Sequence, residues 1–230
     1  MSRAVGSRRV RLVALVLVCC AVMLATEGMA GAGGGNVLPV PARPQGYSLS
    51  AMTGATAQFS TSSNNPAFYP QTPFQVLYAD PSTFGFNPDG CGLVLTGTNT
   101  LTVAPGKTFF VPVFNVDDSP PVLGTFPTTS AGAQSYFFDP SQLGGRDFAI
   151  SIDGTVTPLG HGYLSGPVNT PPLPDGGGTH IITLGAFVAP MTRGAHTVTL
   201  TGGLFGALIP ANFGGACSLS IDYHYTVNVT

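Results

Sequence analysis

The clearest alternation of hydrophobic and polar residues lies at the end of the chain, in residues 217–229. The odd positions carry Cys217, Leu219, Ile221 and further apolar or tyrosine side chains, and the even positions carry serine, aspartate, histidine, threonine and asparagine. A period of two is typical of a β-strand with one buried and one solvated face. We therefore expect a long terminal strand here.

A second pattern, in residues 148–159, predicts a hairpin. Phe148, Ile150 and Ile152 alternate with small residues. Asp153-Gly154 then separates this run from a second β-prone run at residues 155–159. Asp-Gly is a strong hairpin signal because both central residues of a type I′ turn have positive φ. Further β-prone runs lie at 74–78, 92–95, 100–103, 107–116, 179–184 and 196–201. Pro112 lacks a ladder donor, so the run at 107–116 is expected at an edge or with a bulge.

These short strands, punctuated by Gly and Pro, predict an all-β fold: a single antiparallel β-sandwich or jelly roll covering residues 46–230. Beyond residue 32 the chain has no Glu and only one Lys. Helix surfaces are usually built from Glu, Lys, Gln, Arg and Ala. We therefore expect little or no helix.

The N-terminal segment has the pattern of a secretory signal peptide. Four arginines precede an apolar run at 12–25, and small residues follow at Ala30 and Ala32, after either of which cleavage would fit. The run is short of the roughly 20 residues that span a bilayer. We predict a signal peptide at 1–32, a Gly- and Pro-rich flexible linker at 33–45, export to the extracellular space or cell envelope, and no transmembrane segment in the mature chain.

Charge and cysteine content narrow the function classes. Removing the predicted signal leaves four basic and nine acidic residues, with no basic patch for nucleic acid or an anionic membrane. Cys91 and Cys217 remain as the two mature cysteines, and in an exported protein such a pair is expected to form a disulfide. Closing a loop of more than 100 residues would contribute about 4–5 kcal/mol in the chain-entropy model.

Four strings support a resemblance: PGKTFFVPVFNV (105–116), FAISIDGTVTPL (148–159), RGAHTVTLTGG (193–203) and SLSIDYHYTVNV (218–229). Together they resemble a family of uncharacterised secreted bacterial β-sandwich proteins of immunoglobulin-like or jelly-roll type. The resemblance implies export and the sandwich fold, and it implies no activity. Arg193-Gly194-Ala195 stands where that family has a Pro-Gly turn.

The longest irregular stretch predicts where a ligand would bind. Residues 160–178 are rich in Gly and Pro and hold His161 and Tyr163, and His180 follows directly. Long loops in compact domains are usually functional or disordered. His161, Tyr163 and His180 are therefore the predicted ligand-binding residues, with a passive insertion as the alternative.

The acidic doublet Asp117-Asp118 is the predicted metal site. Clustered carboxylates can bind Ca²⁺, which takes six to eight oxygen ligands. The alternative is a solvated turn before Ser119, with no cofactor. No HxH, HxxxH or HExxH spacing supports a histidine metal site.

No motif identifies a catalytic site. The chain has no GxSxG elbow and no tryptophan for a glycan platform. We therefore expect a secreted, non-enzymatic β-sandwich binding or structural module, with a surface or glycan ligand that the sequence does not identify. The alternative is an exported enzyme, a hydrolase or metal-dependent, with its site at the 160–178 loop, where His161, His180 and the aspartate doublet would have to converge.

Overall fold

A computed structural model describes residues 36–230. The predicted signal peptide at 1–32 and the first three residues of the predicted linker lie outside these residues. From residue 36 the chain already contacts the folded domain: Val37 forms an antiparallel bridge with Val188, and the Leu38 N–H donates to the Phe187 carbonyl at 2.8 Å. The contacts of the domain therefore begin about ten residues before the boundary at residue 46 that the sequence predicts.

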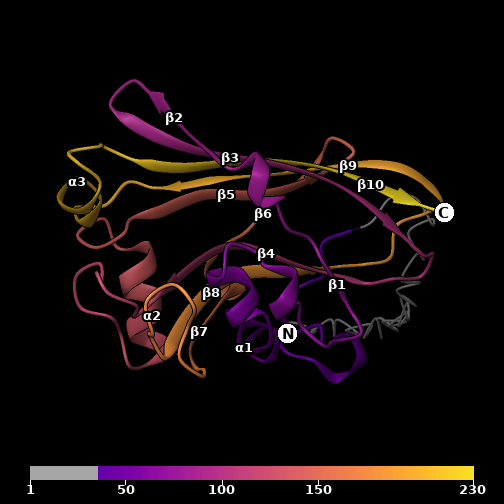
Figure 1. Ribbon diagram of the computed structural model, residues 1–230, viewed down its shortest axis with the longest axis horizontal. Helices are drawn as coiled ribbons and strands as arrows, with labels where there is room; N and C mark the ends of the chain where they lie inside the picture. The colour runs from indigo at the N-terminus through magenta and orange to yellow at the C-terminus, as the bar shows by residue number, and fades with distance from the viewer. Residues whose placement is uncertain (1–35) are drawn as a thin grey trace, which may run out of the picture. The chain divides into compact units, whose positions relative to one another are not determined.

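The described strands form two mixed sheets that pack face to face, as the predicted sandwich requires (Figure 1). The four-stranded sheet has the order β1 (Gln75–Val76), β4 (Phe109–Asp117), β8 (His180–Val188) and β7 (Leu164–Asn169). The six-stranded sheet has the order β2 (Gly85–Asp89), β3 (Gly92–Val103), β10 (Leu219–Val229), β9 (Gly194–Leu204), β5 (Gly145–Ile152) and β6 (Thr155–Pro158).

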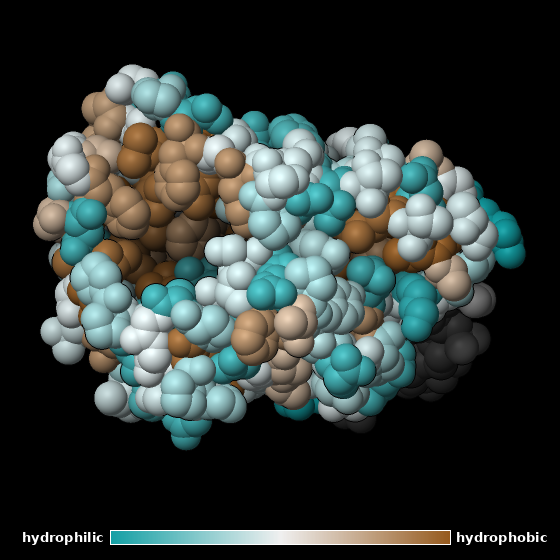
Figure 2. All heavy atoms as spheres, in the orientation of Figure 1, coloured by the Kyte–Doolittle hydropathy of each residue, from teal (hydrophilic) through white to brown (hydrophobic). Residues whose placement is uncertain are grey.

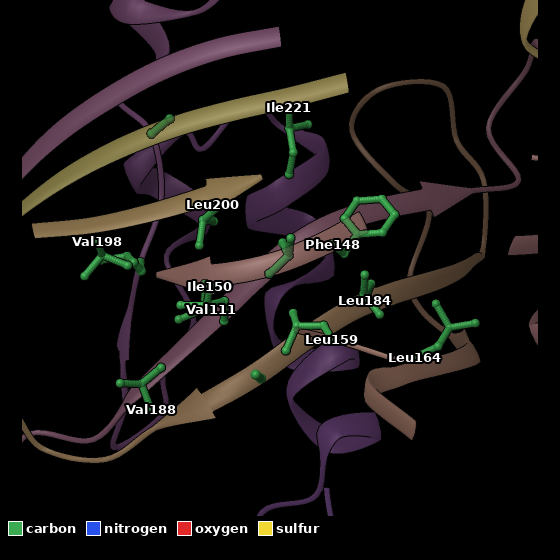
Figure 3. Packing of buried hydrophobic residues seen from close by; sticks show 14 of the residues in the cluster. Val111, Phe148, Ile150, Leu159, Leu164, Leu184, Val188, Val198, Leu200 and Ile221 are labelled. Atoms are coloured by element: carbon green, nitrogen blue, oxygen red, sulfur yellow. The ribbon is translucent and has the colours of Figure 1, made fainter. Parts of the chain in front are cut away.

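The main core lies between the two sheets. Figure 3 shows side chains of both sheets pointing toward one another, with Val111 and Leu184 on one side and Ile150, Leu200 and Ile221 on the other. In β10 the odd-numbered residues belong to this core, as the alternation predicts. The terminal strand is therefore confirmed.

The expectation of an antiparallel sandwich is wrong for two strand pairs, since β10 pairs with β3 in parallel and β1 pairs with β4 in parallel. The predicted disulfide between Cys91 and Cys217 is present and accounts for the first pair. It joins the residues just before β3 and β10, with Cα atoms 5.5 Å apart. Both strands start at this crosslink and run the same way from it.

Two local predictions are confirmed. Asp153 and Gly154 have φ values of 50° and 83° and connect β5 to β6, with Ile152 opposite Thr155. These angles are those of a type I′ turn. In β4 the register against β8 shifts between Pro112 and Phe114, which is the bulge that Pro112 predicts.

The expectation of little or no helix is wrong. Helix α1 (Leu49–Thr61) begins at Ser48, whose hydroxyl accepts from the Ala51 N–H at 3.1 Å, and it buries Met52, Ala57 and Phe59. It contacts β7 and β8 on the outer face of the four-stranded sheet, where Met52 packs with Phe187. Burial of this face stabilises a helix that has no charged residue, because tertiary packing outweighs intrinsic propensity.

The other helices are shorter. Helix α2 (Ser130–Phe138) contacts β7 and β5, and α3 (Leu208–Asn212) lies in the connection between β9 and β10. Short 3-10 turns are η1 (Pro44–Gly46), η2 (Pro66–Phe68), η3 (Pro81–Thr83) and η4 (His161–Tyr163). None of the helices within residues 36–230 has the length and apolar character needed to cross a membrane.

Strand β8 is buried on both faces, from Ile181 to Val188. Ile182 and Leu184 face the six-stranded sheet, whereas Ile181 and Phe187 face the segment that carries α1. A strand covered on both faces keeps no polar alternation. The sandwich thus has a third, helical layer on one side (Figure 1).

Candidate functional site

A cleft of about 570 Å³ opens between the two sheets. Strand β1 pairs only with Phe109 and Phe110, so residues 111–117 of β4 have no strand neighbour on that side. The chain then crosses from β1 to the edge strand β2 of the other sheet, and the cleft lies where the sandwich stays open. Figure 2 shows an apolar hollow at the end of the molecule that carries β2 and α3.

Aromatic side chains form much of the cleft wall, and they come from three regions distant in sequence: residues 78–86, β4 and β10. They are Tyr78 after β1, Phe84 and Phe86 at β2, Phe114 on β4, and Tyr223 and Tyr225 on β10. Phe86 is 64% exposed, which is unusual for so large an apolar side chain. The wall is therefore an apolar surface that the fold itself leaves uncovered.

The hydroxyl of Tyr225 is one polar group in the cleft that the described fold leaves without a hydrogen bond; the fully buried hydroxyls without a partner are those of Thr53, Thr72, Ser165 and Thr170. Tyr225 is only 4% exposed, yet its hydroxyl makes no hydrogen bond within residues 36–230. Burial raises the pKa of Tyr223 to about 12 and the pKa of Tyr225 further, so both are neutral phenols at physiological pH. A buried phenol normally finds a partner. In the cleft such a partner can be supplied by a ligand.

Two carboxylates line the same cleft. The Ser119 N–H donates to Asp117 Oδ1 at 2.8 Å, and the Ser119 hydroxyl donates to Asp175 Oδ1 at 2.8 Å, which brings the end of β4 and the loop before β8 together. Burial raises the pKa of Asp117, and the nearby charge of Asp175 raises it further, against the hydrogen bonds from Ser119. The cleft therefore has a negatively charged part beside its aromatic wall.

Asp118, the second residue of the predicted metal doublet, does not line the cleft as Asp117 does and instead binds the backbone at the start of β8. Its Oδ1 accepts from the N–H groups of Thr179 and His180 at 2.6 and 2.8 Å, and its Oδ2 lies 2.7 Å from His180 Nδ1. Although burial opposes it, these contacts lower the pKa of Asp118. The carboxylate thus fastens the end of the 170–179 segment to β4. Within residues 36–230 no cluster of three or more His, Cys, Asp or Glu could hold a metal ion.

The predicted ligand residues do not gather at one place. His161 lies 2.9 Å from Gln134 Oε1 through Nδ1 and stacks on Phe138 at 4.0 Å, so it packs against α2. The Tyr163 hydroxyl donates to the Leu38 carbonyl at 3.2 Å. Neither shares a hydrogen-bond partner with His180. Much of the predicted loop is also regular, because η4 and β7 occupy residues 161–169.

Thr179, His180 and Asp118 contact one another near this loop, but their geometry is not that of a catalytic triad. Thr179 Oγ1 lies 3.1 Å from His180 Nδ1, the same ring nitrogen that contacts Asp118. In a triad, the nucleophile and the carboxylate must contact opposite nitrogens of the histidine. The three residues therefore form a structural contact.

Strand periodicity assigns Tyr223, Tyr225 and Phe114 to the core, so the sequence alone does not predict them as site residues. One signal was present: two tyrosines occupy adjacent inward positions of β10, where aliphatic residues precede and follow them. A phenol at an inward position indicates a polar partner or a wet cavity. Comparisons of the chain with family models, with curated proteins and with solved structures find no match.

Proposed function

We propose that this protein is an exported, non-enzymatic β-sandwich module that acts at or outside the cell surface and binds a ligand in the cleft between its sheets. The signal-like N-terminus and the Cys91–Cys217 disulfide support export, since disulfides persist mainly in oxidising compartments. The resemblance to secreted bacterial β-sandwich proteins agrees with this proposal.

The observation that carries the binding role is the cleft itself. Ligand sites are typically clefts of about 300–1,000 Å³ with apolar walls and a few polar groups, and this cleft of about 570 Å³ has that composition. Asp117 belongs to the predicted metal doublet and Asp175 to the 160–178 loop, whereas the predicted ligand residues His161, Tyr163 and His180 do not line the cleft. A concave cleft with an aromatic wall suits a small ligand better than an extended glycan, which usually binds to a flat aromatic surface.

Binding of the neutral dye Nile red to the folded protein tests this role. We expect saturable fluorescence enhancement with one dye per chain. Phe86→Ser, at the cleft, should weaken dye binding about fivefold, the equivalent of about 1 kcal/mol of lost apolar contact. Val156→Ser is the matched control, because Val156 is 63% exposed on β6, the opposite edge strand of the same sheet.

Two results would overturn the proposal. One is the absence of saturable binding to the wild-type protein. The other is equal weakening by the two variants, because the dye would then bind exposed apolar residues in general. Circular dichroism of both variants confirms that the fold is intact.

A further inference from the structure

The cleft carries negative charge that the protein does not neutralise. Asp117 and Asp175 line it, and no Lys, Arg or His is among its lining residues. Within residues 36–230 neither carboxylate contacts a basic side chain, whereas Asp147 contacts Arg146 and Asp118, Asp153 and Asp222 each contact a histidine. A half-buried carboxylate without a cation is costly, because burial weakens its hydration.

The aromatic wall beside these carboxylates is also attractive to cations. The faces of tyrosine and phenylalanine rings carry negative electrostatic potential, and cages of such rings bind organic ammonium groups. Tyr78, Phe84, Phe114 and Tyr223 supply rings to the cleft, and within residues 36–230 the neighbouring hydroxyl of Tyr225 makes no hydrogen bond. The carboxylates and the rings thus favour the same sign of charge.

We propose that the ligand of this cleft is a small organic ammonium cation, whose apolar body packs on the aromatic wall and whose charge is neutralised by Asp117 and Asp175. This inference rests on the proposed binding function and names its ligand class. Anions are excluded by charge. Ca²⁺ fits less well, because it needs six to eight oxygens and much of the wall is carbon.

The test compares benzyltrimethylammonium with neopentylbenzene, which has the same shape and no charge. Each is titrated into the purified protein and followed by chemical-shift changes of backbone amides. We expect the cation to bind at least about tenfold more tightly than the neutral isostere. The shifts should map to β10, β4 and the 84–86 segment.

Asp117→Asn with Asp175→Asn keeps the side-chain shapes and removes both charges. We expect this double variant to lose most of the preference for the cation and to keep only the smaller part that the aromatic rings supply. The single variant Asp175→Asn changes an exposed residue and should lose part of the preference, so the test holds even where the double variant folds poorly. Asp222→Asn on the outer face of β10 is the control and should behave as the wild type.

The outcomes separate this inference from the proposed function. Equal affinity of the wild type for both probes, with shifts in the cleft, overturns the cation inference and leaves the binding module standing. A preference that is undiminished in the double variant also overturns it. Failure of both probes to bind overturns it too, and the Nile red experiment then decides the binding role separately.

Discussion

Raising the pH from about 5 to about 9 is expected to destabilise the domain through His196. The side chain of His196 is 8% exposed at the start of β9, with Nδ1 2.6 Å from Asp153 Oδ2 and Nε2 2.9 Å from the Thr192 carbonyl. Both partners are acceptors, so only the imidazolium can donate to both. The hydrogen bond to Asp153 is the main cause that raises the pKa of His196 above 6.5.

The sign of the effect follows from this raised pKa. The stabilisation is fully present below pH 6.5, the ordinary value, and is lost as the pH rises through the higher pKa of the folded state. The neutral ring keeps one N–H, so one acceptor loses its donor. Hydrogen bonds to charged groups contribute about 1.5–3 kcal/mol, and because Asp153 is 41% exposed we take the lower part of the range, about 2 kcal/mol.

Thermal unfolding measured across this pH range tests the argument. About 2 kcal/mol corresponds to a fall of about 4–8 °C in the midpoint of a domain of this size. Asp153→Asn keeps an acceptor for the Thr197 N–H and tolerates positive φ, so it removes the charge with little change in the turn. The wild-type advantage over this variant should shrink with rising pH.

The control is Asp222→Asn, which removes the carboxylate from the exposed contact between Asp222 and His224 on β10. Exposed ion pairs contribute little, so its difference from the wild type should stay small at every pH. A wild-type advantage over Asp153→Asn that is constant or grows toward high pH would refute the role assigned to His196.

Two further substitutions test local structure. Gly154→Val should cost more than about 1 kcal/mol, because it places a β-branched residue at a φ of 83°, and an unchanged unfolding midpoint would reject the type I′ turn. Leu173→Ala should cost about 2–4 kcal/mol in urea unfolding, because Leu173 is 2% exposed and packs on Ala57 and Ile181. Stability equal to that of the wild type would mean that the 170–179 segment is a passive insertion.

Local sequence determined the elements whose physical cause is local. The hairpin at Asp153-Gly154 follows from turn geometry, the terminal strand follows from its period of two, and the bulge in β4 follows from the missing N–H of Pro112. The Cys91–Cys217 bond could also be predicted, because only two cysteines remain after the predicted signal. The first three predictions depend only on residues adjacent in the chain, and the disulfide depends only on the number of cysteines. None of them requires knowledge of distant contacts.

Only the tertiary structure decided the helices, the parallel pairs and the cleft. Helix α1 forms because its apolar face packs on β7 and β8, and nothing in its own composition predicts that burial. The cleft exists because β1 is too short to cover the edge of β4, which brings Asp117, Asp175 and Tyr225 from three distant segments to one surface. Period-two patterning shows that a side chain points inward, but whether it meets a packed core or an open cleft depends on which strands lie opposite it.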